Sequence, residues 1–196
     1  MSIIQHLKSM NNTLKLLIIS DIFVFSGFGL ISPIIAIFID SNIKDGSIFS
    51  AGFASAIFLI VQAVLQIIFS YKFNPKDRLW MLRVGTIIIA LVPFGYIFST
   101  TIYHIYLVQF IYGVGAAFAY PAWSSLFTAN LEKGKRGFQY SVYSSGVGIG
   151  TAITAGLGAW LAEVTNFVVV FLLTGFMAII GLLLLFKLNK KILDKT

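Results

Sequence analysis

The sequence predicts an all-α membrane protein with six transmembrane helices, and three observations support this prediction. The chain has 196 residues, of which 58% are hydrophobic and only 11% are charged. Soluble globular domains are less apolar and carry about 25% charged residues. Six apolar segments follow one another, each long enough to cross the hydrocarbon core of a bilayer as a helix. Short connectors between these segments hold most of the basic residues. A single transmembrane domain is therefore expected over residues 1–196.

The first apolar segment, residues 16–39, sets the pattern for the others. It is too long to be the apolar region of a signal peptide, and no small-residue cleavage site follows it, so it is expected to be a retained span. The sixth segment is almost purely aliphatic and aromatic. In order along the chain, the expected spans are residues 16–39, 48–71, 84–101, 103–128, 138–162 and 167–187.

The basic residues are divided unequally between the two sides of these spans. With six spans, thirteen of the fourteen Lys and Arg residues fall in the two termini and in the connectors after the second and fourth spans. The opposite side has Lys44 alone, beside Asp40, Asp45 and Glu163. Because cytoplasmic segments are enriched in Lys and Arg, both termini are expected in the cytoplasm. The net charge of +7 is thus explained by orientation in a cell (plasma or inner) membrane, with no nucleic-acid partner.

Several classes of chemistry are excluded by what the sequence lacks. There is no cysteine, which rules out disulfides, thiol catalysis and Cys-based metal sites. Both histidines, His6 and His104, lie outside the apolar segments, and no Gly-x-Ser-x-Gly motif of a serine hydrolase is present. The seven acidic residues are scattered, and no Gly-x-x-x-x-Gly-Lys-Ser/Thr phosphate loop occurs. The sequence therefore predicts neither an enzyme nor an ATP-driven pump, and no cofactor or metal.

Glycine and proline residues recur in a way that divides the chain into two halves. In the fifth segment, Gly146 and Gly150 form a small-x-x-x-small face that allows close approach of another helix. The first and fourth segments each carry Gly-x-Gly followed by a proline that can bend the helix. These motifs are Gly27, Gly29 and Pro33, and Gly113, Gly115 and Pro121.

Aligning the two Gly-x-Gly motifs places spans four to six over spans one to three. Because each unit has three spans, the two units must cross the membrane in opposite directions. The prediction is an inverted repeat of residues about 14–101 and about 103–188. Inverted three-plus-three repeats are typical of transporters, with the substrate site near the midplane where the repeats meet.

Asp21 is the one ionisable residue well inside an apolar segment. A carboxylate there needs a partner, a proton or a water-filled cavity. Three roles stay open: an ion pair with Arg83 or Arg136, a carboxylate that binds a transported proton, and a counter-ion for a cationic substrate. The same helical face carries three more side chains, which line a solute site or face lipid: Phe25, Phe28 and Ser32.

Polar and aromatic side chains of the other segments complete the candidate pathway. Gln62 and Gln66 lie four residues apart, and such amides commonly hydrogen-bond a neighbouring helix rather than a solute. Trp123 and Trp160 are assigned to packing or interfacial anchoring. A lone histidine in a connector, His104, is expected to be solvated. The candidate pathway residues are Asp21, Phe25, Phe28, Gln62, Gln109, Tyr112, Tyr120 and Tyr143.

Residues 105–158 resemble helices 4 and 5 of the major facilitator superfamily. The matching motifs are Gln109-Phe110, Gly113-Val114-Gly115-Ala116-Ala117, Pro121-Ala122 and Arg136-Gly137. The connector after the second span resembles the family's signature Gly-x-x-x-Asp-Arg-x-Gly-Arg-Arg at Asp77 and Arg78. Phe73, Trp80 and Met81-Leu82 depart from that signature. The fifth span has Gly150-Thr151 where the family's antiporters have Gly-Pro, so exchange does not follow from the resemblance.

The resemblance implies one six-helix half of a transporter that usually has twelve spans. A lone half would expose its polar pathway face to lipid, so we expect a parallel homodimer with the pathway along its two-fold axis. Rocking of the two protomers would then move a small solute by alternating access, with protons as the candidate coupling ion. The alternative is a non-transporting membrane subunit, or a half that needs a different partner half.

The resemblance also implies a set of gating residues near the cytoplasmic side. In such a dimer, Asp77 is expected at the positive N-terminus of the partner's fifth span, near its Arg136 and Phe138. The gating candidates are Asp77, Arg78, Arg83 and Arg136.

Overall fold

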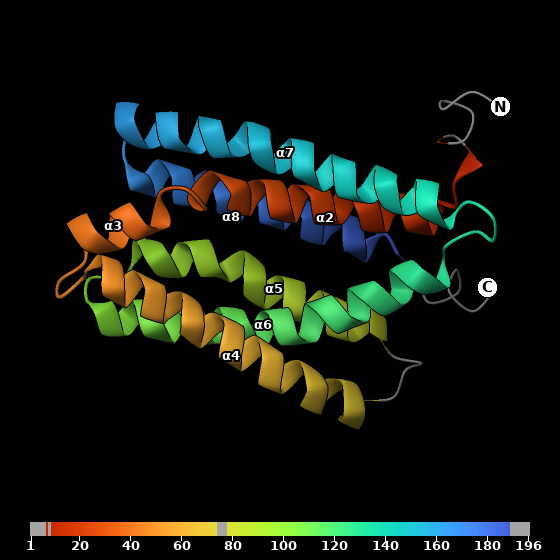
Figure 1. Ribbon diagram of the computed structural model, residues 1–196, viewed down its shortest axis with the longest axis horizontal. Helices are drawn as coiled ribbons and strands as arrows, with labels where there is room; N and C mark the ends of the chain where they lie inside the picture. The colour runs from red at the N-terminus through yellow and green to blue at the C-terminus, as the bar shows by residue number, and fades with distance from the viewer. Residues whose placement is uncertain (1–6, 8, 74–77, 189–196) are drawn as a thin grey trace.

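The computed structural model describes residue 7 and residues 9–73 and 78–188, which form an elongated bundle of roughly aligned helices (Figure 1). Six of the helices named here are at least 18 residues long and apolar enough to cross a membrane. In chain order the helices are α2 (Asn12–Ile31), α3 (Ile35–Asn42), α4 (Ile48–Lys72), α5 (Arg78–Ile97), α6 (Ile102–Ala129), α7 (Arg136–Val164) and α8 (Phe167–Phe186).

Four of the six predicted spans agree with these helices to within about two residues, whereas the first is interrupted and the third is shifted toward the N-terminus. The third was expected to begin at residue 84, but α5 begins at Arg78, because the basic residues at its start are helical rather than part of a connector. Long basic side chains can extend from a helix end to the polar interface while their apolar stems stay packed. Hydropathy alone therefore placed the start of this helix too late.

The prediction of one continuous first span over residues 16–39 is wrong. The helix stops at Ile31, and a short turn through Pro33 leads into the separate helix α3. Proline has no N–H to donate to the carbonyl of Gly29, and its ring clashes with that carbonyl in a continuing helix. In contrast, Pro93 and Pro121 lie inside the unbroken helices α5 and α6.

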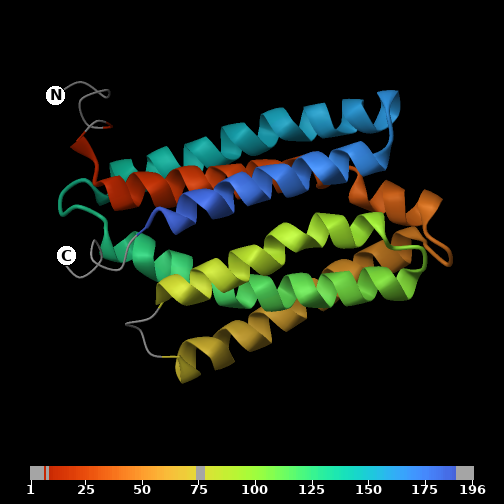
Figure 2. The ribbon, with the colours of Figure 1, turned by 180° about the vertical axis from the view of Figure 1, so that it is seen from behind.

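The six long helices form two groups of three. Helix α2 packs against α7 and α8, and α6 packs against α4 and α5. The contact of α5 with α8 joins the groups, which lie one above the other when the bundle is viewed from either side (Figures 1 and 2). Each group thus combines helices from both halves of the chain, and α2 and α6 occupy equivalent positions in them. This exchange of helices leaves one face of the bundle with α2 and α6 in the middle and with α7 and α4 at its edges (Figure 1).

Small residues set the distance between α2 and α7. A Cβ at Gly158 would lie about 2.1 Å from the Leu30 carbonyl oxygen, and one at Gly150 would lie about 2.2 Å from Ser26 Oγ. At Gly146 the nearest atom would be Ile22 Cδ1. The predicted close approach at Gly146 and Gly150 is confirmed, and it brings Asp21 on α2 close to the start of α7.

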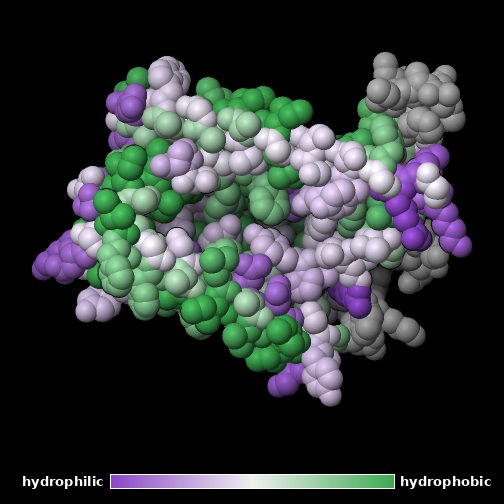
Figure 3. Space-filling view, in the orientation of Figure 1, coloured by the Kyte–Doolittle hydropathy of each residue, from purple (hydrophilic) through white to green (hydrophobic). Residues whose placement is uncertain are grey.

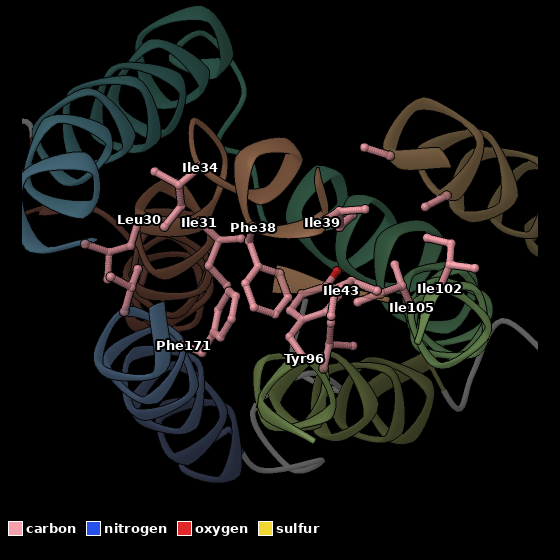
Figure 4. Packing of buried hydrophobic residues seen from close by; sticks show 14 residues of the cluster. Leu30, Ile31, Ile34, Phe38, Ile39, Ile43, Tyr96, Ile102, Ile105 and Phe171 are labelled. Carbon is pink, nitrogen blue, oxygen red and sulfur yellow. The ribbon is translucent and has the colours of Figure 1, made fainter. Parts of the chain in front are cut away.

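The largest buried cluster lies at the end of the bundle where α3 joins α4. Phe171 on α8 is fully buried there and contacts Phe38 edge-on at 4.8 Å and Tyr96 at 5.5 Å between ring centroids. Figure 4 shows these rings meeting between the two helix groups, together with Ile31 and Ile39. Such aromatic contacts fix the relative positions of α3, α5 and α8 at this end.

Helices α4 and α7 are the least buried of the six. The side chains of Ile60, Ile67, Ile149 and Ile153 are each about 60–70% exposed, as expected for residues that face lipid. On the face seen in Figure 3, less hydrophobic side chains surround a central hollow, which lies between α2 and α6.

Candidate functional site

Two cavities lie in series along α2 and α6. The first, here called the Asp21 chamber, has a volume of about 240 Å³ and is lined by Asp21, Phe25, Tyr120, Trp123, Ser124 and Tyr143. The second, the Gln109 chamber, has about 250 Å³ and is lined by Phe28, Ile31, Ser32, Ile35, Ser55, Phe58, Tyr96, Gln109 and Tyr112. Both contain side chains of α2 and of the antiparallel α6, so they follow one another along the helix axes.

The Asp21 chamber places one carboxylate among aromatic rings from three helices. Tyr143 on α7 donates a hydrogen bond of 2.8 Å to Asp21 Oδ2. Phe25, one helical turn from Asp21, stacks on Tyr120 of α6 with ring centroids 6.1 Å apart. Trp123 packs against Tyr143 at 4.5 Å and directs its indole N–H to the Leu17 carbonyl at 3.5 Å. The carboxylate is therefore held in a fixed direction inside an aromatic cavity.

Within the described residues, no Lys or Arg side chain lies within ion-pair distance of Asp21. Arg83 instead donates to the carbonyl oxygens of Leu185 (3.4 Å) and Leu188 (2.5 Å) at the end of α8, and its guanidinium lies over the Phe186 ring. A cation at a helix C-terminus is favoured by the helix dipole. Arg136 is exposed at the start of α7. In this structure Asp21 therefore forms an ion pair with neither Arg83 nor Arg136, the two partners considered above.

The Gln109 chamber is bounded by a stack of three rings. Tyr112 on α6 lies between Phe28 of α2 (4.9 Å) and Phe58 of α4 (4.3 Å), nearly parallel to both. Gln109, one turn before Tyr112, is buried, and its amide has no hydrogen-bond partner among the described residues. A solute in this chamber would therefore meet an amide with free hydrogen-bonding capacity beside stacked aromatic faces.

Seven of the eight predicted pathway residues line one of the two chambers. Asp21, Phe25, Tyr120 and Tyr143 share the first chamber, and Phe28, Gln109 and Tyr112 share the second. Gln62 lines neither of them. The side-chain amides of Gln62 and Gln66, both on α4, have no hydrogen-bond partner in the described part of the chain.

Sequence reasoning missed other lining residues. Trp123, assigned above to packing or anchoring, forms a wall of the Asp21 chamber, and Tyr96 and Phe58 line the second chamber. Trp123 lies three residues after Tyr120 and thus close to the same helical face, which was the available signal.

The predicted gating residues are only partly placed. Asp77 lies outside the described residues. Arg78 lines a small cavity of about 90 Å³ with Ser70, Phe73 and Pro121, at the end of the bundle where α4 stops and α5 starts. Arg83 and Arg136 occupy the positions given above, so the described part of the chain does not bring the gating candidates together.

A polar network ties the connector between α6 and α7 to the first turns of α7. The carboxylate of Glu132 accepts hydrogen bonds from Lys135 Nζ (2.8 Å) and Gln139 Nε2 (3.1 Å), and the Glu132 N–H donates to Gln139 Oε1 at 2.9 Å. Gln139 is fully buried. The Lys135 ammonium, with help from the Gln139 amide, holds the pKa of the Glu132 carboxyl below its usual value.

No three His, Asp or Glu side chains gather to bind a metal ion in the part of the chain that the structure describes. The chambers offer one carboxylate, hydroxyl and amide groups, and aromatic faces. These groups suit the binding of a small molecule rather than covalent chemistry.

Comparison with known protein families identifies a match over nearly the whole chain. The family model of the Major Facilitator Superfamily matches residues 17–195, nearly the whole chain and both groups of helices. No curated protein matches.

Proposed function

Because the chain belongs to the Major Facilitator Superfamily and is therefore a multi-pass membrane transporter, we propose that it moves a small solute by alternating access as a parallel homodimer. The two protomers would face each other across the hollow of Figure 3. Their chambers would then form a single pathway along the two-fold axis. The uneven distribution of basic residues supports an orientation with both termini in the cytoplasm of the cell membrane.

The observation that best supports transport is the pair of chambers in series along α2 and α6. Each holds polar groups at membrane depth, where an unpaired polar side chain costs free energy unless a ligand, water or another helix satisfies it. The Phe28–Tyr112–Phe58 stack lines the Gln109 chamber. In sequence, Phe28 lies between Ile31 and the residues of the Asp21 chamber on α2, and Tyr112 lies between Gln109 and those on α6. Such a path, with polar groups on both sides of an aromatic barrier, suits a solute that passes stepwise.

The exposed surface of α7 supports the homodimer. One face of this helix, here called the small-residue stripe, is exposed and consists of Ser141, Ser145, Gly148, Ala152 and Gly156. The adjacent face, with Ile149, Ile153 and Trp160, carries the large apolar side chains expected toward lipid. Lipid contact gives no reason for a face made only of Gly, Ala and Ser, whereas such a face allows a second helix to pack closely.

Helix α4 offers the complementary surface. Its unpaired amides, Gln62 and Gln66, lie on the same side as the exposed Gly52 and Ser55. Because α4 and α7 occupy opposite edges of the open face, a two-fold rotation would bring α4 of one protomer against α7 of its partner (Figure 1). Amide and hydroxyl side chains could then form hydrogen bonds across the interface.

The packing pattern also supports an inverted repeat. Helix α2 contacts α7 and α8 as α6 contacts α4 and α5, so the two halves of the chain have equivalent roles. Two such repeats can rock against each other around a fixed midplane site. Asp21, which has no basic partner among the described residues, is the carboxylate that would bind the coupling proton.

Transport can be tested in proteoliposomes loaded with the pH indicator pyranine, with four radiolabelled probes: benzyltrimethylammonium, glucose, alanine and benzoate. We expect a proton gradient to drive at least one probe faster than in protein-free liposomes. Asp21→Asn should abolish the dependence on the gradient, and Glu163→Gln, which removes an exposed acid that lines neither chamber, should leave it unchanged. Equal fluxes with and without protein would overturn the proposal. An unchanged gradient dependence in Asp21→Asn would remove the coupling role alone.

The competing function is that of a membrane subunit or half that works only beside a different chain. The same exposed faces of α4 and α7 would then be covered by that chain. Oligomeric state in mild detergent discriminates: a stable homodimer supports the proposal, and a stable monomer supports the competitor.

A further inference from the structure

Asp21 stands out among the polar groups of the bundle because no cationic side chain among the described residues pairs with its carboxyl group. Its one hydrogen-bond donor is the neutral Tyr143 hydroxyl, and no cationic side chain in the described residues reaches it. The arginine considered as its partner, Arg83 on α5, is bound instead to the carbonyl end of α8. A carboxylate at this depth requires a positive charge or a proton to be stable.

The space in front of Asp21 has the walls of a cation site. Phe25, Tyr120, Trp123 and Tyr143 surround the cavity, and the Phe25–Tyr120 and Trp123–Tyr143 ring pairs hold these walls in place. The faces of aromatic rings attract cations, and quaternary ammonium groups in particular bind in cages of such rings. A hydrated metal ion would find one carboxylate and few other oxygen ligands here, whereas calcium requires six or more.

The volume of the chamber within one protomer favours a compact ligand. At about 240 Å³, the chamber is smaller than the 300–1,000 Å³ of sites for drug-sized molecules. It therefore suits a compact cation with an apolar body.

We propose that the Asp21 chamber is a binding site for a small organic monocation of the ammonium class, with Asp21 as counter-ion and the four aromatic residues as its cage. The ligand supplies the charge that the protein lacks, and Tyr143 fixes the direction of the carboxylate. This assignment rests on the proposed transport function, because it names the substrate class of that pathway. An anion is repelled by Asp21, and a neutral solute leaves the carboxylate uncompensated.

The test is equilibrium binding to the purified full chain in mild detergent. Trp123 reports from the chamber wall once Trp80 and Trp160, both exposed and outside the chamber, are changed to Phe. The probes are benzyltrimethylammonium and its uncharged carbon isostere neopentylbenzene, which differ in charge but not in shape. We expect saturable quenching by the cation and at least tenfold weaker binding of the isostere.

Four variants separate charge from structure. Asp21→Asn should weaken binding of the cation at least tenfold, and Asp21→Glu should retain it within a few-fold. Tyr120→Leu, which keeps the charge but removes an aromatic face, should weaken it several-fold. Glu163→Gln is the control and should bind as the parent does. Melting temperature and elution volume establish that each variant is folded.

Equal binding of the two probes, or unchanged binding in folded Asp21→Asn, would overturn the assignment. If Asp21→Asn does not fold, two other measurements still test the assignment. These are the binding of the two probes to the parent protein and the binding of the cation to the Tyr120→Leu variant. If the cation binds but no solute crosses the membrane of the proteoliposomes, the proposed transport function is wrong and the proposed cation site stands. If another probe is transported and the cation does not inhibit its flux, the proposed cation site is wrong and the proposed transport function stands.

Discussion

Tyr143 determines how the Asp21 carboxylate is presented, because its hydroxyl is the one donor that reaches Asp21 in the described structure. The neighbouring Tyr140 has a similar ring but is 58% exposed, and its hydroxyl makes no hydrogen bond to a described residue. The two tyrosines therefore differ in one hydrogen bond to an ionisable group at membrane depth, and they provide a matched pair for measuring it.

Replacing Tyr143 with Phe should lower the stability of the protein by about 1.5–3 kcal/mol, the range for a hydrogen bond to a charged group. The ring contacts with Trp123 and Phe127 are retained in this variant. Unfolding in a mild detergent, followed by tryptophan fluorescence, measures the change. Tyr140→Phe should be neutral, and equal effects of the two substitutions would show that the bond to Asp21 contributes nothing.

At the scale of elements, the contact between α2 and α7 depends on the absence of a side chain at Gly158. A methyl group there would overlap the Leu30 backbone, which cannot move aside as a side-chain end can. Gly158→Ala should therefore destabilise the protein by about 1–3 kcal/mol through overpacking. Gly137→Ala, on the same helix with open space around the added carbon, is the control. The free energies of unfolding of the two variants can be compared in detergent. Equal stabilities would contradict the close approach of α2 and α7 at Gly158.

The connector before α7 should respond to pH through Glu132. Because the pKa of its carboxyl is lower in the folded protein than its usual value, the charged form stabilises the fold above that usual value, about 4.3. This contribution is lost as the pH falls through the folded-state pKa. The stability difference between the parent and Glu132→Gln should thus be small and positive near neutral pH and should vanish in acid.

Unfolding midpoints measured between pH 3 and pH 7 would test the role of Glu132, with Glu163→Gln as the control at the opposite end of α7. Salt should reduce the difference, since the Lys135–Glu132 pair is about one-third exposed on both sides. A difference that grows as the pH falls would contradict the assigned direction of the pKa shift.

The elements also show what the sequence could and could not predict. Helix existence followed from hydropathy, because long apolar segments have few other solutions in a bilayer. The effect of proline did not follow: Pro33 ends a helix, whereas Pro93 and Pro121 do not. The local sequence does not say which neighbouring groups compensate for the freed carbonyl. Similarly, Asp21 was identified as a site residue, but its pairing with Tyr143 depends on how α2 and α7 are rotated against each other.

At the scale of the whole molecule, the proposed homodimer predicts that a second copy of the chain covers the open face of the bundle. Helices α7 and α4, which carry the small-residue stripe and the two amides, lie at opposite edges of that face, so a two-fold axis would pair each helix with the other (Figure 1). Neither surface matches the purely apolar character of a lipid-facing helix.

Gly148→Leu should convert the dimer to a monomer in mild detergent, because Gly148 lies in the centre of the stripe and a bulky side chain would hold the partner's α4 away. Within the protomer the added carbon meets nothing within 4 Å, so the protomer itself should remain folded and keep its melting temperature. Ile149→Leu, one residue away on the lipid-facing side, is the control and should stay dimeric. Light scattering coupled to size exclusion gives the mass, and energy transfer between labelled protomers in liposomes extends the measurement to a bilayer. A Gly148→Leu protein that remains dimeric in both would show that α7 does not form the interface, and the pathway would then have to be closed by other surfaces.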